Sequence, residues 1–483
     1  MSIQSIDFTS LAPPMALAVG ALVVLVVDLF VPKGSRVPGV LALVASVVAA
    51  GLMPATSGDQ TLCVEQSCGY AVNALTLSLQ AITIAATVVV VLMSMVSVKD
   101  ARIPAGEYFF LLLCSASGAM LVAATTDLVS LVVALELVSL PTFALIGLNT
   151  VDRRAGEAAL KAFLFSVASV AVSLYGLALI YGSTATVAFV PLSIAAASNR
   201  PTPVATAGLV MVLAVIAFKI AAVPFHTWAP DAYEGAPIPV AAYLSVVSKT
   251  AGFAALTLVL ATFASWYDVW APVIAVVAAL TMLLANMVAL RQRGAVRLLA
   301  WSSIAQAGYV LVPFGAVVAG TQGSAGLLAA VVGYLVAYAA MNLGAFAVVA
   351  VVSRDQPRAR IADFAGLAWR SPWLGLSLAF FLACLAGLPP GIIGLLIKVQ
   401  VIAIPVATGA WWLTAAMAVS TVIGLYYYLS WAAVLFKRPE ELAKTPLHLA
   451  GALPMQLAVG AMMIVTVGLS IAPSLALGLL DRL

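Results

Sequence analysis

Long runs of apolar residues, separated by short polar stretches, follow one another along almost the whole chain. Most runs reach the ~20 residues that a helix needs to cross the hydrocarbon core of a bilayer. The pattern therefore predicts an all-α polytopic membrane protein with about fourteen spanning helices. The predicted spans cover residues 13–31, 37–54, 72–97, 108–125, 128–148, 158–182, 205–233, 237–263, 270–290, 298–318, 325–352, 371–406, 409–436 and 450–476.

Two of these spans are interrupted by proline. Pro224 lies within residues 205–233, and Pro389 and Pro390 lie within residues 371–406. Proline lacks a backbone donor and clashes with the preceding turn, so it bends or breaks a helix. In a bilayer the freed backbone groups are tolerated only where protein or water meets them. We therefore expect both breaks to lie beside a buried polar path.

Composition supports a membrane location. Of the 483 residues, 64% are hydrophobic and only 8% are charged, and the mean hydropathy is +1.15. A water-soluble globular protein carries far more charge than this. The predicted spans leave no room for a large soluble domain. The net charge of +4 is small, and the sequence contains no basic cluster suited to nucleic acid.

Lysine and arginine are distributed unevenly between the two sets of predicted loops. One side carries only Arg200 and Arg482. Basic loops stay in the cytoplasm, so we expect the richer set there and both chain termini on the external side. The first helix lacks a basic leader and is expected to be retained. The cytoplasmic set is Lys33, Arg36, Lys99, Arg102, Arg153, Arg154, Arg291, Arg293, Arg297, Arg354, Arg358, Arg360, Arg370, Lys437, Arg438 and Lys444.

A few charged residues fall inside the predicted spans. Glu136, Lys219, Lys249 and Lys398 lie near the middle of their spans, and Lys161 lies one turn inside its span. An ionised side chain at the bilayer centre costs roughly 2.5 to 3.5 kcal/mol on insertion scales. Several such residues in one chain require a compensating function or a hydrated interior.

A series of buried lysines is chemically suited to relaying protons. Desolvation favours the neutral amine, whereas a neighbouring carboxylate favours the ammonium form. Movement of Glu136 toward or away from Lys219 would therefore switch the lysine between holding and releasing a proton. The side chains available to carry protons between the lysines are Ser139, Ser245, Ser248 and His226.

Each of these residues also has a purely structural interpretation. Lys161 follows Glu157 by four residues, so an i,i+4 ion pair or snorkelling to the interface explains it equally well. The three deeper lysines could form static buried ion pairs, with Glu136 as one structural partner. His226 could simply hydrogen-bond the backbone at the helix break.

Two cysteines share one predicted external loop. Cys63 and Cys68 are five residues apart, and an oxidising compartment would permit a disulfide between them. Free thiols are equally compatible with the sequence.

The segment from Phe218 to Lys249, FKIAAVPFHTWAPDAYEGAPIPVAAYLSVVSK, carries a family resemblance. It closely resembles the core of the antiporter-like membrane subunits of proton-pumping NADH:quinone oxidoreductase, respiratory complex I. The YEGAP block, and a lysine at Lys249 where subunits L and M tend to carry a histidine-rich motif, resemble subunit N. The run EAALKAFLFSVASVAVSLYGLALIYG and the position of Glu136 are similar to subunit N as well.

The resemblance implies a fold and a division of the chain. It implies two five-helix repeats of inverted topology, each with one broken helix, over residues 108–263 and 270–436. Residues 1–107 would supply three preceding helices and residues 450–483 a final one. The motif GLPPGIIGLLIK is more aliphatic than the glycine and phenylalanine pattern common at the second break, so the resemblance does not define the local path there.

The resemblance also implies a function, which is proton translocation across a bacterial plasma membrane. Glu136 and Lys219 would be the coupled pair, Lys249 a central relay and Lys398 the lysine of the second half-channel. Lys161 matches the lysine of the family's EAALK run. The implied partners are lipid and the other antiporter-like and small membrane subunits of complex I. No cofactor is expected in this chain, since FMN and the iron–sulfur clusters belong to partner subunits.

Three other functions remain compatible with the sequence. A subunit of a multi-subunit sodium/proton antiporter shares the broken-helix plan and needs no redox partner. A purely structural membrane subunit would use its charges only to hold helices together. A stand-alone secondary transporter would carry a small-molecule substrate.

Overall fold

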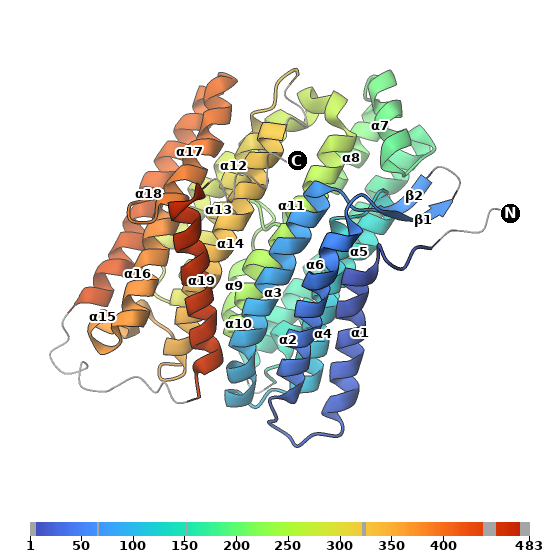
Figure 1. The fold of residues 1–483 in the computed structure, drawn as a ribbon. Coiled ribbons are helices and arrows are strands. Elements are labelled where there is room, and N and C mark those ends of the chain that lie inside the picture. Colours follow the sequence, from blue (N-terminus) through green and yellow to red (C-terminus); the bar gives the residue numbers. More distant parts are fainter. Residues whose placement is uncertain (1–5, 65–66, 151, 321–324, 438–450, 474–483) are drawn as a thin grey trace.

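The computed structural model describes residues 6–64, 67–150, 152–320, 325–437 and 451–473. These residues form a bundle of helices that stand side by side, with one small hairpin at an end of the bundle (Figure 1). The helices are α1 (Ala12–Asp28), α2 (Val37–Leu52), α3 (Ala74–Asp100), α4 (Ala105–Val122), α5 (Leu128–Gly147), α6 (Arg153–Thr184), α7 (Phe189–Ser198), α8 (Pro203–Lys219), α9 (Trp228–Gly235), α10 (Ile238–Tyr243), α11 (Lys249–Thr262), α12 (Tyr267–Ala289), α13 (Ala295–Gly315), α14 (Ala325–Ser353), α15 (Leu367–Arg370), α16 (Pro372–Ala386), α17 (Ile392–Ala407), α18 (Trp411–Phe436) and α19 (Leu453–Ile471).

The prediction of an all-α polytopic membrane protein is confirmed. Within the described ranges, eleven helices are long and apolar enough to cross a membrane. Each predicted span coincides with one helix or with a run of consecutive helices, although several of those helices are shorter than a full span. The last predicted span corresponds to α19, and residues 438–450 and 474–483 on either side of it lie outside the described part of the chain.

Both predicted helix breaks are present. α8 ends at Lys219 and α9 begins at Trp228, while α16 ends at Ala386 and α17 begins at Ile392. The peptide bonds before Pro224 and Pro390 are cis. The prolines thus interrupt the two spans, as the loss of a backbone donor requires.

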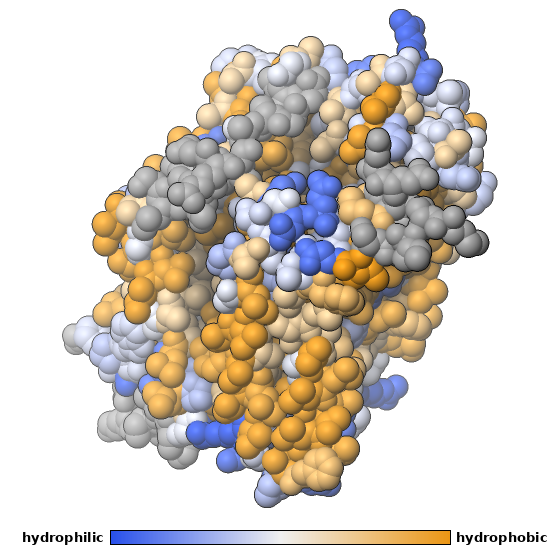
Figure 2. All heavy atoms as spheres, turned by 45° about the vertical axis from the view of Figure 1, so that its right-hand side comes forward, coloured by the Kyte–Doolittle hydropathy of each residue, from blue (hydrophilic) through white to orange (hydrophobic). Residues whose placement is uncertain are grey.

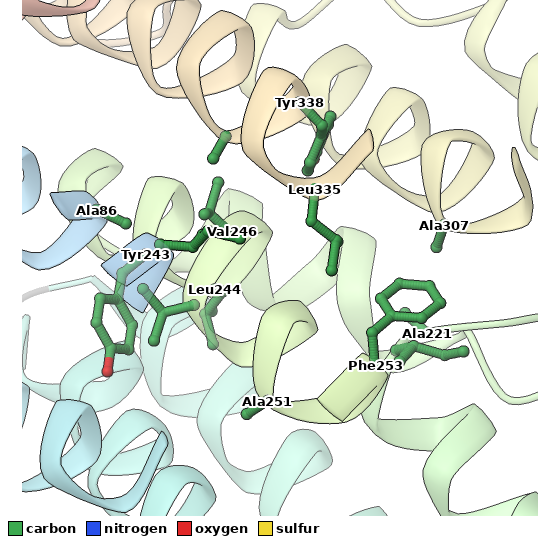
Figure 3. Packing of buried hydrophobic residues seen from close by; sticks show 14 of the residues in the cluster. Ala86, Ala221, Tyr243, Leu244, Val246, Ala251, Phe253, Ala307, Leu335 and Tyr338 are labelled. Carbon is green, nitrogen blue, oxygen red and sulfur yellow. The ribbon is translucent and has the colours of Figure 1, made fainter. Parts of the chain in front are cut away.

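The helix that follows the first break runs through the centre of the bundle. α10 continues into α11 through a π-helical turn, Leu244–Ser248, and most residues of this stretch are buried. Figure 3 shows Val246 of the turn between Ala86 of α3 and Leu335 of α14, and the turn contacts both of these helices. A π turn shifts the register of the residues that follow it and is often found at functional sites. Lys249 is the first residue after this turn.

Small residues let some helices approach one another closely. Gly176 of α6 faces Gly208 of α8, and a Cβ atom added to Gly176 would lie 2.8 Å from the Gly208 carbonyl oxygen. In lipid the hydrophobic effect does not drive helices together, so van der Waals contact between close backbones contributes much of the association. α6 and α8 can pack this tightly only because both positions lack a side chain.

The outer surface fits a bilayer. Figure 2 shows a broad hydrophobic area over the lower part of the visible face, with hydrophilic residues above it and along its lower edge. Large apolar side chains such as Leu160, Leu164 and Tyr175 of α6 are exposed. A water-soluble protein would not present so much apolar surface, whereas lipid tails accept it.

One end of the bundle carries the hairpin formed by β1 (Gln60–Val64) and β2 (Ser67–Ala71). Cys63 and Cys68 pair across it and form a disulfide, which resolves the choice that the sequence left open. Tyr70 of β2 bridges to Thr125, next to the start of α5. The hairpin is thereby tied to the connection between α4 and α5.

α7 was not predicted. The hydropathy pattern left the connection between residues 182 and 205 without a helix, whereas Phe189–Ser198 forms one. Ten residues cannot cross a membrane, so a search for spanning runs passes over such a helix. α7 lies at the same end of the bundle as the hairpin (Figure 1).

Candidate functional site

Glu136 and Lys219 form a buried ion pair. Glu136 is on α5 and Lys219 is the last residue of α8, and the Lys219 Nζ lies 2.6 Å from the Glu136 Oε1. The ammonium also donates to the Ser139 Oγ at 2.7 Å and to the Ser166 Oγ at 3.1 Å. The Lys219 side chain is only 6% exposed and the Glu136 side chain 20% exposed. All three donor positions of this buried ammonium therefore have an acceptor.

Backbone groups at the first helix break have hydrogen-bond partners from neighbouring side chains. The Trp228 indole N–H donates to the Phe218 carbonyl at 3.0 Å, and the Val223 N–H donates to the Thr281 Oγ1 at 3.0 Å. Backbone groups freed by a proline break must find partners when no water is present. α8 can therefore end at Lys219 inside the bundle without leaving these groups unpaired.

Lys249 lies close to this break. A Cβ atom added to Gly252 of α11 would lie 2.6 Å from the Ile220 Cγ2 and 3.6 Å from the Lys219 carbonyl carbon. α11 therefore packs directly against the backbone beside Lys219, and Gly252 is less than one turn from Lys249. The geometry thus brings the first two predicted lysines onto neighbouring elements.

The environment of Lys249 differs from that of Lys219. Lys249 is 3% exposed, and its Nζ donates to the backbone carbonyl of Ser303 on α13. It forms no ion pair with any described residue. The Ser303 hydroxyl in turn accepts from the Tyr338 O–H of α14 at 2.8 Å. Lys249 therefore connects the first lysine site to polar groups of α13 and α14.

Lys398 also lacks a carboxylate partner among the described residues. Its Nζ donates to the carbonyls of Leu385 and Ala386 at 2.9 Å each and lies 5.4 Å from the centre of the Tyr309 ring. The two carbonyls are at the end of α16, where the break leaves them without helical donors. Gly387 follows them at φ +84°, and a Cβ atom there would lie 3.1 Å from the Lys398 Cδ. Glycine is needed at this position for two reasons. It adopts the positive φ of the turn, and it leaves room for the Lys398 side chain.

Buried polar side chains of α12, α13, α14 and α18 lie between the surroundings of Lys249 and those of Lys398, and we call them the polar network. Gln306 of α13 accepts from the Tyr334 hydroxyl and donates to the Tyr428 hydroxyl at 3.2 Å, and Tyr428 is hydrogen-bonded to Ser302. Tyr309 and Tyr334 stack with ring centres 6.3 Å apart. The other members, which connect Tyr309 to α12 and α18, are Asn286, Ser420, Thr421 and Tyr427.

Sequence reasoning missed this network. Its members come from α12, α13, α14 and α18, and no short motif contains them. A signal was present nevertheless, because Asn286 and Gln306 are uncharged polar residues inside apolar spans. Such residues are costly in lipid unless they find partners.

His226 lies beside the first break and is buried. Its ring contacts Trp301 of α13, with ring centres 5.4 Å apart. Its Nδ1 and the Trp301 Nε1 have no hydrogen-bond partner among the described residues. The structure thus places His226 near the break, and it forms no hydrogen bond with a buried lysine in the described part of the chain.

Lys161 is separate from the buried lysines. It is 46% exposed, pairs with Glu157 at 2.7 Å and lies 3.3 Å from Asp231 of α9. Asp231 and Glu234 also bind Arg297 of α13. The i,i+4 pair considered from the sequence is therefore present, within a surface cluster that joins α6, α9 and α13.

The arrangement can hold and pass protons through groups that titrate or reorient. One ammonium faces a carboxylate, two face backbone carbonyls, and hydroxyl and amide groups lie between them. No cluster of three or more histidine, cysteine or acidic side chains suited to a metal ion occurs within the described ranges.

Comparison with known proteins places the chain in a family. Residues 125–424 match the family described as NADH:quinone oxidoreductase/Mrp antiporter, TM. The chain is 48% identical to NADH-quinone oxidoreductase subunit N 2 of Streptomyces griseus over 457 residues, which are 92% of this chain and 85% of that protein.

Solved structures agree with this relationship. A chain of respiratory complex I from Thermus thermophilus with bound aureothin is similar over 96% of this chain and 98% of its own length, with 30% identity and a TM-score of 0.79. A chain of the Mrp complex from Dietzia shares the fold over 98% of this chain and 96% of its own, with 20% identity and a TM-score of 0.82. The resemblance noted in the sequence is confirmed, and the chain belongs to the family of NADH:quinone oxidoreductase and Mrp antiporter membrane subunits.

Proposed function

We propose that this chain translocates protons across a bacterial plasma membrane as a membrane subunit of respiratory NADH:quinone oxidoreductase. The observation that carries the proposal is the buried series of Lys219 with Glu136, Lys249 and Lys398, each within a helix of the bundle or beside a break. Family membership and the 48% identical relative named subunit N support the assignment to the respiratory enzyme.

The residues take distinct roles in this proposal. Glu136 controls the charge of Lys219 through their 2.6 Å contact. Lys249 accepts the proton next and passes it through the tyrosine and amide network to Lys398. Moving one proton against 100 mV requires about 2.3 kcal/mol, which is within the range of the interaction of a buried lysine with a mobile carboxylate. His226 and Lys161 are assigned to the periphery of this path.

The proposal includes a division into two repeats. Residues 108–263 and 270–436 would form them, between helices of residues 1–107 and a last helix in residues 450–483. In each set of five predicted spans the fourth is broken, which supports the division. The arginine-rich loops would face the cytoplasm and both termini the outside. FMN, the iron–sulfur clusters and quinone reduction would belong to partner subunits.

Two single substitutions test the proposal. Lys219→Ala and Glu136→Ala should each abolish NADH-driven proton uptake by inverted membrane vesicles, while the assembled complex remains present on a native gel. Lys99→Ala and Glu107→Ala are matched controls, because both side chains are exposed at helix ends. Normal pumping by both site variants would refute the proposal.

Copurification separates the respiratory assignment from an Mrp-type antiporter, which the family description also covers. A tagged chain should copurify with flavin and iron–sulfur absorbance. A purified assembly without either chromophore would support the antiporter instead.

A further inference from the structure

A large polar cavity opens at the end of the molecule that carries the arginine-rich loops. Its volume is about 1130 Å³. Five connections surround it, those between α3 and α4, α5 and α6, α9 and α10, α12 and α13, and α14 and α15. These loops lie at the lower end of the bundle in Figure 1. We call this cavity the arginine basin.

The lining of the arginine basin is strongly charged and carries more basic than acidic side chains. Arginines come from two of these connections and from the first turns of α6 and α13, so they approach the cavity from different directions. The charged lining residues are Arg154, Arg293, Arg297, Arg354, Arg358 and Arg360, with Asp100, Asp152, Glu234 and Asp355.

Several of the carboxylates already have defined partners. Asp100 binds Arg354 at 2.8 Å, and Glu234 binds Arg297 at 2.5 Å. Asp152 accepts the backbone N–H of Arg154 at 2.9 Å and caps α6. Asp100 and Glu234 are therefore already paired with two of the six arginines.

Four of the six guanidinium groups form no ion pair with a described residue, those of Arg154, Arg293, Arg358 and Arg360. Arg154, Arg293 and Arg358 are exposed and form no salt bridge with any residue in the described part of the chain. Like charges around one cavity repel one another, so an anion in the cavity would lower their energy.

The loops that carry two of these arginines are fixed to each other. The Ala295 N–H donates to the Ala359 carbonyl at 2.8 Å, and the Ile361 N–H donates to the Arg293 carbonyl at 2.9 Å. Gly294 and Arg360 form an isolated β-bridge between them. Arg293 and Arg358 are thus held on paired backbones rather than on independent loops, which reduces the entropy lost on binding.

We propose that the arginine basin binds a phosphate-bearing anion through Arg154, Arg293 and Arg358. The planar guanidinium group donates two parallel hydrogen bonds to a phosphate, which suits an arginine cluster to this ligand. The phosphate comes from the headgroup of an anionic phospholipid or from a soluble phosphorylated molecule. This site is independent of the proton path and goes beyond the proposed function.

The excess of arginine on this side also has a simpler cause, which is the placement of positive charge on cytoplasmic loops. That cause applies equally to Arg153, the first residue of α6, and to Arg291 in the α12–α13 connection, which are exposed on the same side but do not line the basin. It predicts no difference between the two groups of arginines. A binding site predicts that only the basin arginines matter.

The test uses the full chain purified in detergent, with inorganic pyrophosphate as the probe in equilibrium dialysis at constant ionic strength. Wild type should bind pyrophosphate saturably, and Arg293→Ala/Arg358→Ala should bind it at least about tenfold more weakly. The matched control, Arg153→Ala/Arg291→Ala, should bind like wild type. A thermal unfolding scan in the absence of pyrophosphate verifies that both double variants are folded.

A second measurement identifies the source of the phosphate and guards against loss of folding. In nanodiscs of phosphatidylglycerol, a lipid ligand would prevent pyrophosphate binding that persists in phosphatidylcholine nanodiscs, whereas a soluble ligand would leave binding equal in both. Arg293→Lys/Arg358→Lys keeps the charge and should bind with intermediate affinity. Absence of saturable binding to wild type, or an equal loss in the Arg153→Ala/Arg291→Ala control, would overturn the proposal.

Discussion

The two broken helices hold their lysines in opposite ways. At the first break, Lys219 ends the helix before the interruption and faces the carboxylate of Glu136. At the second break, Lys398 lies on the helix after the interruption and binds the carbonyls of Leu385 and Ala386. One buried ammonium is therefore compensated by a full negative charge and the other by backbone dipoles and an aromatic ring.

The difference determines how each site can be switched. A carboxylate side chain can rotate away, so the charge of Lys219 depends on the position of Glu136. The carbonyls that hold Lys398 belong to the backbone beside Gly387 and cannot leave without refolding the break. We infer that the first site is the adjustable one, and that Lys398 responds to the charge of its neighbours through the polar network.

The largest effect should follow from breaking the ion pair at the first site. Glu136→Gln leaves a buried ammonium without its counter-charge, so we expect the free energy of unfolding to fall by about 3 kcal/mol and pumping to be lost. SDS titration of the purified chain measures the first effect. Adding Lys219→Met to Glu136→Gln should restore most of the stability but not the pumping. Equal stability of Glu136→Gln and wild type would mean that the pair is not coupled in the membrane.

The second site should lose transport with little change in stability. Lys398→Met removes a buried charge that has no carboxylate partner, and this gain offsets the loss of a donor to two carbonyls. We expect unfolding free energy to change by less than about 1 kcal/mol while vesicle acidification is lost. A destabilisation as large as that of Glu136→Gln would show that the two sites do not differ in the way described.

Tyr309 permits a sharper test of the second site. Tyr309→Phe keeps the ring over Lys398 but removes the hydroxyl that Asn286 and Thr421 contact, so pumping should fall about threefold, as expected for one modest hydrogen bond. Tyr309→Leu removes the aromatic face as well and should lower the rate further. Initial rates of proton uptake measure both. Identical rates for Tyr309→Phe and Tyr309→Leu would exclude a role for the ring.

The smallest effect is expected at Lys161. Its ion pairs are exposed at the surface, so Lys161→Ala should change the unfolding free energy by no more than about 0.5 kcal/mol and leave most pumping intact. Pumping at different salt concentrations checks this assignment. Complete loss of transport in Lys161→Ala would place this residue within the path instead.

Much of the fold could be predicted from the sequence because lipid imposes simple rules. A run of about 20 apolar residues marks a span, and a proline inside it marks a break, so α8, α9, α16 and α17 were located correctly. α7 escaped the same rule because it is too short to span. The disulfide between Cys63 and Cys68 could not be predicted in the same way. It depends on the register of the β1–β2 hairpin, which hydropathy does not reveal.

The candidate site could be predicted only in part. Charged residues in apolar runs are conspicuous, so Lys219, Lys249, Lys398 and Glu136 were found from the sequence alone. The contact of Glu136 with Lys219 was expected and is present. The tyrosine and amide network was missed because its hydrogen bonds join four helices that are distant in sequence. Partners across a bundle depend on helix packing, which no local pattern encodes.

The central claim is that protons pass through the buried lysines, and Lys249 lies between the two sites. The most direct test is the number of protons moved per NADH oxidised by assembled complexes in proteoliposomes, comparing wild type with Lys249→Met. The proposed path predicts that this ratio falls in Lys249→Met and remains at the wild-type value in the surface control Lys99→Ala. An unchanged ratio in Lys249→Met would contradict it.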